Sequence, residues 1–277
     1  MLNFRFFLLI SLINLIILPA FSSFAEPKKS RDKIVPQPIQ ELFQSNLVYP
    51  QEKDEIQLTL FPSFRKNKST QKTRTLFEVE YGITDALQVI FEWEGLLYKN
   101  PKSDPAIAGV GNIEVGAQYS WMGMGDGNTH FSFGNLIEFP VGPVESGLTE
   151  GFIEVQPFIV LARDFPELNQ SQIFLELGFD WVKQARNVPE SIAPEIDNIS
   201  WNIGAFFPIK LWRATIEING NNNKLDGGSI NDIYITPGTI YKLSKEWEMG
   251  IATPIGVTKT SDDCRVVGYL MWEFELD

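Results

Sequence analysis

Hydrophobic and polar positions alternate along most of the chain after residue 54. In NIEVGAQYSW, residues 112–121, the odd positions are apolar or aromatic and the even positions are polar or small. A period of two is typical of a β-strand whose two faces meet different surroundings. The pattern therefore raises the question of which face meets water and what the other face meets.

The same alternation predicts twelve strands from residue 55 onward. They span nine to thirteen residues each, which is longer than the usual strands of soluble sheets and matches the length that crosses a bilayer at a tilt. Bacterial single-chain barrels also require an even number of strands. The predicted spans are 55–64, 72–82, 86–94, 110–121, 128–140, 151–162, 171–182, 198–207, 211–220, 230–241, 246–255 and 265–276.

The connections between these spans alternate in length. Short breaks such as 83–85 and 122–127 follow every second strand, whereas longer breaks rich in Gly, Pro, Asn and Asp, such as 95–109 and 221–229, lie at the other end. Outer-membrane barrels have short periplasmic turns and longer outer loops. We therefore expect an all-β fold, a single antiparallel up-and-down transmembrane β-barrel of about twelve strands with both termini on the short-turn side.

The first 25 residues have the pattern of a cleaved secretory signal peptide. Arg5 precedes an apolar run over residues 6–18, and small residues at 23–25 supply a cleavage site. The apolar run is well short of the ~20 residues that a spanning helix needs, which argues against an uncleaved anchor. The sequence therefore predicts export from the cytoplasm.

Residues 26–54 differ in composition from the rest of the chain. They are rich in Pro, Gln and charged residues, with a short apolar patch over residues 42–49. We interpret them as a periplasmic lead-in or partial plug. The domain organisation expected is a signal peptide over 1–25, this lead-in over 26–54, and the outer-membrane barrel over 55–277.

The charge balance excludes one class of partner. The formal charge is −12, and it becomes −13 when Arg5 leaves with the signal peptide; the sequence pI is about 4.7. Nucleic acid is therefore not an expected partner, because a chain this acidic cannot neutralise phosphates. Cys264 is the single cysteine, so no internal disulfide can form.

Carboxylates dominate the polar face of the predicted strands, and lysines are confined to loops and strand ends. A soluble exterior usually mixes charge signs, so we expect the polar face to line a lumen and the apolar face to meet lipid. A secreted soluble barrel with an apolar interior would give the same alternation inverted, and this is the alternative. The predicted lumen-lining or solute-binding residues are Glu78, Glu80, Glu92, Glu94, Glu114, Gln118, Glu138, Glu154, Glu176, Asp180, Arg213, Glu217 and Glu248.

All seven tryptophans fall on the apolar face near strand ends. Amphipathic aromatic rings form belts where a barrel wall crosses the two membrane interfaces. The predicted membrane-interface residues are Trp93, Trp181 and Trp201 toward the long loops, and Trp121, Trp212, Trp247 and Trp272 toward the short turns.

Four runs, over residues 47–64, 77–94, 109–121 and 135–144, resemble the meta-pathway phenol-degradation family of outer-membrane transporters. The resemblance implies an outer-membrane channel or uptake protein for aromatic or other small hydrophobic compounds, with no catalytic residues to carry over. One departure concerns the C-terminus. Barrel proteins commonly end on an aromatic residue, whereas here Phe274 is followed by three further residues.

Two groups of residues superficially suggest other chemistry. His130, Ser132 and Asn135 are similar to the grouping of outer-membrane phospholipases, but Asn135 falls on the opposite face of the strand, and we predict no catalytic residues. The glycines of 109–116 and 123–128 precede strands rather than a helix N-terminus, so they are interpreted as turn residues and not as a phosphate cradle.

The function expected is passive or facilitated passage of small solutes, such as neutral aromatic or hydrophobic compounds, through an acidic lumen. The expected partners are outer-membrane lipid, a small-molecule solute and the barrel assembly machinery during biogenesis. No cofactor, metal ion or catalytic activity is predicted. The alternative is a non-conducting structural or ligand-binding barrel.

Overall fold

The structure is a computed structural model that describes residues 37–149, 151–184, 198–225 and 228–276. The predicted signal peptide, the first part of the lead-in and the long connection after residue 184 lie outside these residues. Residues from Gln37 onward form one compact unit. The description below concerns this part of the chain.

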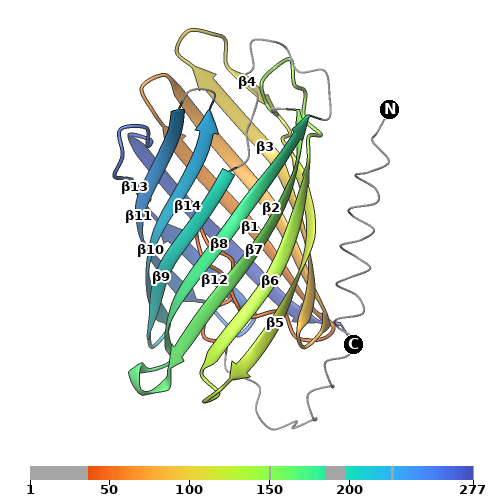
Figure 1. Cartoon of the computed structure of the whole chain (residues 1–277), viewed down its shortest axis with the longest axis vertical. Coiled ribbons are helices and arrows are strands. Elements are labelled where there is room, and N and C mark those ends of the chain that lie inside the picture. Colours follow the sequence, from red (N-terminus) through yellow and green to blue (C-terminus); the bar gives the residue numbers. More distant parts are fainter. Residues whose placement is uncertain (1–36, 150, 185–197, 226–227, 277) are drawn as a thin grey trace. The chain divides into compact units, whose positions relative to one another are not determined.

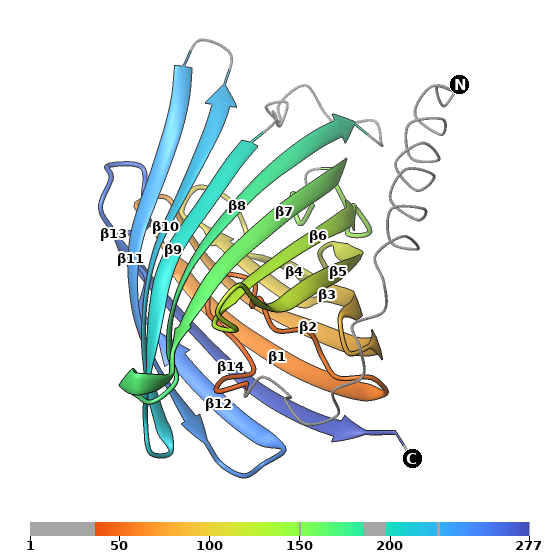
Figure 2. The ribbon, with the colours of Figure 1, turned by 60° about the horizontal axis from the view of Figure 1, so that its bottom comes forward.

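An antiparallel sheet in this part of the chain closes on itself and forms a barrel (Figure 1, Figure 2). β4 pairs with β3 as β5 does, and β13 pairs with β11 as β12 does, so these short pieces complete neighbouring strands and the wall has twelve. The strands are β1 (Glu55–Lys66), β2 (Thr70–Thr84), β3 (Leu87–Pro101), β4 (Ile107–Gly109), β5 (Ile113–Met124), β6 (Thr129–Phe139), β7 (Phe152–Phe165), β8 (Ser171–Gln184), β9 (Asn198–Ile209), β10 (Trp212–Leu225), β11 (Gly228–Lys242), β12 (Trp247–Ala252), β13 (Ile255–Gly256) and β14 (Cys264–Glu275).

Once β4 is counted with β5 and β13 with β12, each strand pairs with its neighbours in the sequence, and β1 pairs with β14 to close the ring. The predicted fold class, an antiparallel up-and-down barrel of twelve strands, is confirmed. A 3₁₀ turn over Pro166–Leu168 is the one helical segment in the described residues. No helix among them is long and apolar enough to cross a bilayer.

Two predicted loops are shorter than the sequence suggested. β3 continues to Pro101, well past the predicted end at residue 94, and the residues predicted as the loop 221–229 instead extend the β10–β11 hairpin to Leu225 and Gly228. The predictions failed because asparagine and glycine favour turns, yet the backbone ladder holds them in strands once register is set. Strand propensity depends on such context.

The barrel wall is inverted relative to a soluble protein. Its outward side chains are apolar and exposed, with exposed fractions of 43% for Leu177, 46% for Ile203 and 52% for Trp212, whereas inward Gln57 and Glu217 are fully buried. In residues 112–121, Val115 is exposed and Gln118 buried, so the odd positions face outward. A water-soluble barrel would place these apolar side chains inside.

Candidate functional site in the barrel lumen

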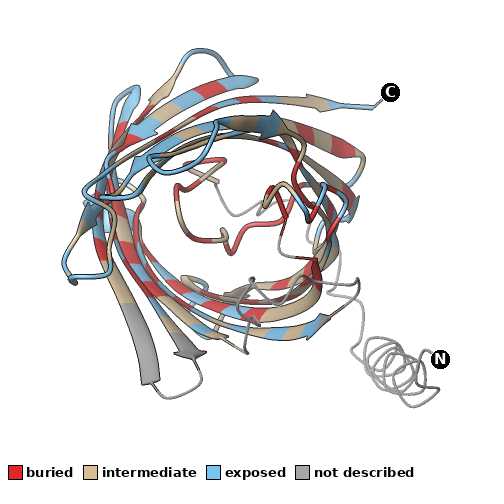
Figure 3. Ribbon diagram, turned by 90° about the horizontal axis from the view of Figure 1, so that it is seen from above, coloured by how far each residue is buried: buried red, intermediate tan, exposed pale blue. Residues whose placement is uncertain are grey.

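The described lead-in is the stretch from residue 37 to residue 54; it lies inside the barrel as far as Gln51, whereas Glu52 and Lys53 are exposed (Figure 3). Its apolar side chains are almost completely buried: Ile39, Leu42, Phe43, Val48 and Tyr49 are each at most 6% exposed. Figure 3, viewed down the barrel, shows this coil within the ring of strands. The short apolar patch seen in the sequence is therefore packed against the lumen wall.

Glu217 on β10 holds the middle of the described lead-in. Its carboxylate accepts hydrogen bonds from the backbone N–H groups of Phe43 and Gln44, both at 3.1 Å, and from the Ser45 hydroxyl at 2.7 Å. Glu217 is completely buried. Because three consecutive residues of the segment donate to this one carboxyl group, Glu217 is the principal polar anchor of the segment.

Two further wall residues hold the flanks of that anchor. Glu176 on β8 accepts from the backbone N–H of Asn46 at 2.6 Å. Arg213 on β10 donates through Nε to the carbonyl of Pro38 at 2.7 Å. Lumen side chains thus satisfy backbone groups of a segment that has no secondary structure of its own, as buried backbone requires.

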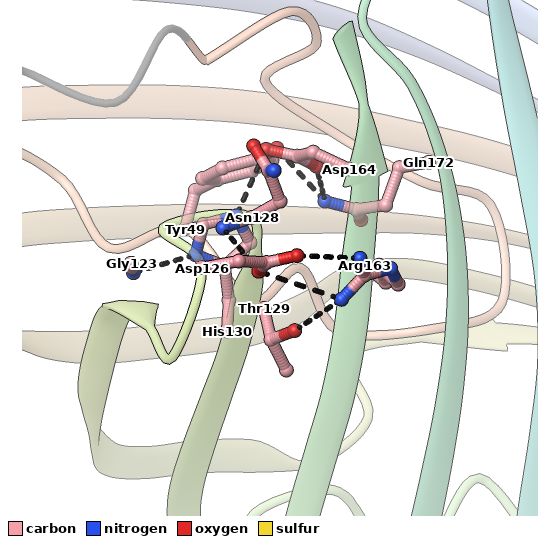
Figure 4. A network of polar contacts seen from close by, with 9 residues as sticks. All are labelled: Tyr49, Gly123, Asp126, Asn128, Thr129, His130, Arg163, Asp164 and Gln172. Atoms are coloured by element: carbon pink, nitrogen blue, oxygen red, sulfur yellow. Dashed lines mark hydrogen bonds and ion pairs between the residues drawn. The ribbon is translucent and has the colours of Figure 1, made fainter.

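A network around Tyr49 forms a third attachment (Figure 4). The Tyr49 hydroxyl donates to Asp164 at 2.7 Å and accepts from Gln172 at 2.8 Å. His130 Nε2 lies 2.8 Å from the other Asp164 oxygen, while the backbone N–H of Gly123 donates to His130 Nδ1 at 3.0 Å. We call this the Tyr49 network; it locks the lead-in to β6, β7 and β8.

The same geometry bears on catalysis. His130 and Ser132 both lie inward, but both ring nitrogens of His130 are engaged, by Asp164 and by Gly123. The imidazole therefore has no lone pair left to activate the Ser132 hydroxyl, as a nucleophilic serine would require. The histidine positions a structural network instead.

Five carboxylates stand directly opposite one another across neighbouring strands. Register pairs them in sequence on β2, β3, β5, β6 and β7. Like charges directly opposite in a sheet repel one another, and this row gathers five carboxyl groups on one side of the lumen. We call it the acid arc: Glu78, Glu92, Glu114, Glu138 and Glu154.

The lead-in adds a carboxylate beside this arc. Carboxylate oxygens of Glu41, Glu78 and Glu80 lie within 4.8 Å of one another, and Gln57 donates to Glu41 at 3.3 Å and to Glu80 at 3.1 Å. Burial, and after it the charge of Glu80, raises the pKa of Glu41 well above its ordinary value of 4.5. Carboxylate oxygens so close together could hold a hard cation. The nearby cation Arg74 forms its ion pair with Glu94, at 2.9 Å, and not with these three residues.

The predicted lumen residues all lie on strands with their side chains toward the interior. They fall into the acid arc, the anchors of the lead-in, and scattered partners such as Gln118, which donates to the carbonyl of Leu47 at 2.8 Å. Asp180 accepts from Asn198 at 2.8 Å. Glu248 accepts from the backbone N–H of Gln40 at 3.2 Å and Glu80 accepts from the Gln51 side chain at 2.9 Å, so these two also contact the lead-in. Glu94 pairs with a wall residue, as Asp180 does.

The predicted tryptophans lie on the outer face. Trp247 and Trp272 stack with ring centroids 5.6 Å apart and an interplanar angle of 10°, and Trp212 contacts Tyr241 at 4.6 Å. Trp121 contacts Tyr119 at the short-turn end, and Trp93 stacks on Phe77. Trp181 is exposed and Trp201 is partly exposed, packed over Gly220.

Sequence reasoning missed Glu41, Tyr49 and Asp164. Glu41 and Tyr49 belong to the lead-in, and alternation says nothing about a segment without strands. Asp164 lies in β7 beyond the predicted end of that strand at residue 162. The one available signal was the apolar patch at 42–49, which has no place in a solvated linker.

Sequence comparisons find no match for this chain: no family model matches it, and no curated protein does. Solved structures match its fold. An outer membrane channel from Pseudomonas putida F1 is 11% identical, with a TM-score of 0.69, over 82% of this chain and 98% of that one. KdgM porin is 12% identical, with a TM-score of 0.50, over 79% and 99%.

The β domain of the Bordetella autotransporter BrkA is 9% identical, with a TM-score of 0.50, over 80% of this chain and 99% of that one. These likenesses establish the fold. At such identities they establish nothing finer. The resemblance drawn from the sequence is thereby supported as far as the fold, an antiparallel barrel, and no family model names the family.

Proposed function

We propose that this protein is an outer-membrane channel that admits small solutes through an acidic lumen narrowed by the described lead-in. The observation that carries the proposal is the closed wall with apolar side chains outside and charged side chains inside. Such a wall meets the requirement that every backbone polar group be satisfied within lipid. Outer-membrane lipid and the barrel assembly machinery are the partners that this architecture implies.

Charge in the lumen sets the expected solute class. Rings of carboxylates favour cations in a pore, and the acid arc supplies five on adjacent strands. Arg74 and Glu94 neutralise one another beside it. Cations and neutral compounds, including neutral aromatic compounds, are therefore favoured, and free inorganic anions are disfavoured at this level of the lumen.

Single-channel conductance in a planar bilayer under a salt gradient tests the proposal. We expect discrete steps with a cation-selective reversal potential. Replacing Glu92 and Glu114 together by glutamine should move that potential toward zero, because two adjacent members of the acid arc lose their charge. Glu167→Gln, an exposed carboxylate in the turn between β7 and β8, is the matched control and should leave selectivity unchanged.

A non-conducting barrel is the second candidate, and the occupied lumen favours it. The described lead-in is held by Glu217, Glu176 and Arg213, so the pathway could stay closed. Protein shown to be inserted but electrically silent, both as wild type and with Glu217 replaced by alanine, would refute the channel proposal. Fractionation with the outer membrane, rather than with the periplasm, checks the location in both cases.

A further inference from the structure

Cations are concentrated at one end of β1, β2, β3 and β14. Five of the chain's 23 lysines and arginines fall within residues 65–74, a stretch without a single carboxylate. The chain as a whole has an excess of acids, 35 against 23 bases. Residues 65–74 thus carry a formal charge of +5 in a chain whose formal charge is −12, so this end of the barrel differs in charge from the rest.

Strand register places four of these cations side by side. Lys99 pairs with Lys72, Lys72 with Arg65, and Arg65 with Arg265. Residues directly opposite in an antiparallel sheet point to the same face, with Cβ atoms roughly 5 Å apart. We call this row the cation arc: Lys99, Lys72, Arg65 and Arg265.

The cation arc faces the lumen. Arg265 lies two residues from Val267 and four from Tyr269, which are buried on the inner face of β14. Lys99 lies two residues from Leu97, which is completely buried. Because side chains alternate along a strand, the arc points inward at the loop end, where Figure 1 shows the β1–β2 and β3–β4 connections.

Neighbouring groups orient two of the four cations. Lys99 Nζ donates to the carbonyl of Gly147 at 3.3 Å, and the Arg265 guanidinium lies 5.4 Å from the centroid of the Tyr234 ring. Arg74, the next inward residue on β2, is paired with Glu94 at 2.9 Å. That ion pair separates the cation arc from the acid arc below it.

The arrangement lowers the stability of the barrel, and a bound anion would offset that loss. Three directly opposed like-charge pairs repel one another, and in the described part of the chain Arg65 and Arg265 form no ion pair with a carboxylate. Lysine and arginine bind carboxylate and phosphate groups through charge-assisted hydrogen bonds. Four strands span about 14 Å at 4.8 Å each, enough for a ligand with more than one anionic group.

We propose that the cation arc is an oxyanion-binding site at the loop end of the lumen, for a small solute that carries two or more phosphate or carboxylate groups. The inference deepens the proposed function and rests on it for the route by which a solute reaches the arc. A solute held there would stop above the acid arc, which repels it. The site would therefore bind and retain an anion, not conduct it.

Isothermal titration calorimetry of the full chain in dodecyl maltoside with inorganic pyrophosphate tests the site. Wild type should bind in a salt-sensitive manner, since exposed charge pairs are screened as ionic strength rises. Arg65→Gln and Lys72→Gln should each weaken binding about tenfold. Lys66→Gln is the matched control, because it removes the adjacent charge of β1 that alternates to the outer face, and it should bind as wild type does.

Several results would overturn the proposal: no binding by wild type, salt-insensitive binding, or an equal loss in Lys66→Gln and Arg65→Gln. If the glutamine variants fail to fold, two results still test the site. Wild-type binding should weaken as salt is added, and Lys72→Arg, which keeps the charge, should bind pyrophosphate as wild type does. Phosphatidylglycerol vesicles distinguish a lipid headgroup from a free phosphate. If vesicle binding depends on Lys66 while pyrophosphate does not bind, the cations serve lipid and the proposal is wrong. Calorimetry does not depend on conduction. Pyrophosphate binding by an electrically silent protein would therefore refute the channel proposal and support the oxyanion-binding site.

Discussion

Replacing Glu217 by alanine removes the principal anchor of the described lead-in. Its carboxylate accepts three hydrogen bonds, from Phe43, Gln44 and Ser45. Each contributes a net ~1 kcal/mol, so the variant should weaken docking by about 3 kcal/mol. Since ~1.4 kcal/mol is a factor of ten, the undocked population should rise roughly 100-fold.

Hydrogen exchange followed by mass spectrometry reads this change directly. The backbone N–H groups of Phe43, Gln44 and Asn46 donate to lumen carboxyl groups while the segment is docked, and exchange in the segment should accelerate about 100-fold in the variant, in proportion to the undocked population. Exchange in the strands of the wall should stay unchanged. Glu167→Ala, which removes an exposed carboxylate in the turn between β7 and β8, is the control. Exchange of residues 37–49 within twofold of wild type would refute the anchoring role of Glu217.

Three further predictions concern the same segment. Gly82→Ala places a Cβ 1.8 Å from the Glu52 carbonyl and should lower the stability of the barrel by about 1–3 kcal/mol. The loss is measured as unfolding at a lower temperature on heated gels, and Gly268→Ala, where the nearest atom is 3.3 Å away, is the control that should unfold as wild type does. Tyr49→Phe removes two hydrogen bonds of ~1 kcal/mol each from the Tyr49 network and should speed exchange of residues 46–51 about thirtyfold. Because burial raises the pKa of Glu41, its contribution to docking should be complete at and below pH 4.5 and be lost as pH rises through the raised pKa; Glu41→Gln should weaken this trend in exchange, corrected for the intrinsic rate, and an unchanged trend would contradict it.

Strand positions could be predicted from the sequence because a wall between lipid and water imposes alternation at every residue. All twelve predicted spans overlap observed strands. Lys99, which the sequence placed in a loop, lies near the end of β3, in keeping with the expectation that lysines occupy loops and strand ends. Beyond the lipid, alternation of apolar residues is no longer required, and charged or amide residues continue the ladder without a hydrophobic signal.

The candidate site was less predictable because it depends on register. The sequence indicates that Glu92 and Glu114 share a face, but only the pairing of β3 with β5 shows that they stand opposite one another. A slip of one residue in register moves a strand's side chains to the other face. The acid arc and the cation arc are both register features, and no composition or spacing within one strand reveals them.

The docked lead-in and the lumen carboxylates depend on one another, yet the segment need not be permanent. Glu217 and Glu176 are buried because residues 43–46 cover them. If the segment leaves, water in the lumen can replace its N–H groups, and neither carboxylate becomes an orphan in a dry core. A net hydrogen bond is worth only ~1 kcal/mol for that reason.

The free energy that holds the segment is therefore set mainly by burial of Phe43 and its apolar neighbours, which water cannot replace. Phe43→Ala should consequently undock the segment more than Ser45→Ala does, and the opposite order in hydrogen exchange would show that polar contacts, not burial, close the lumen.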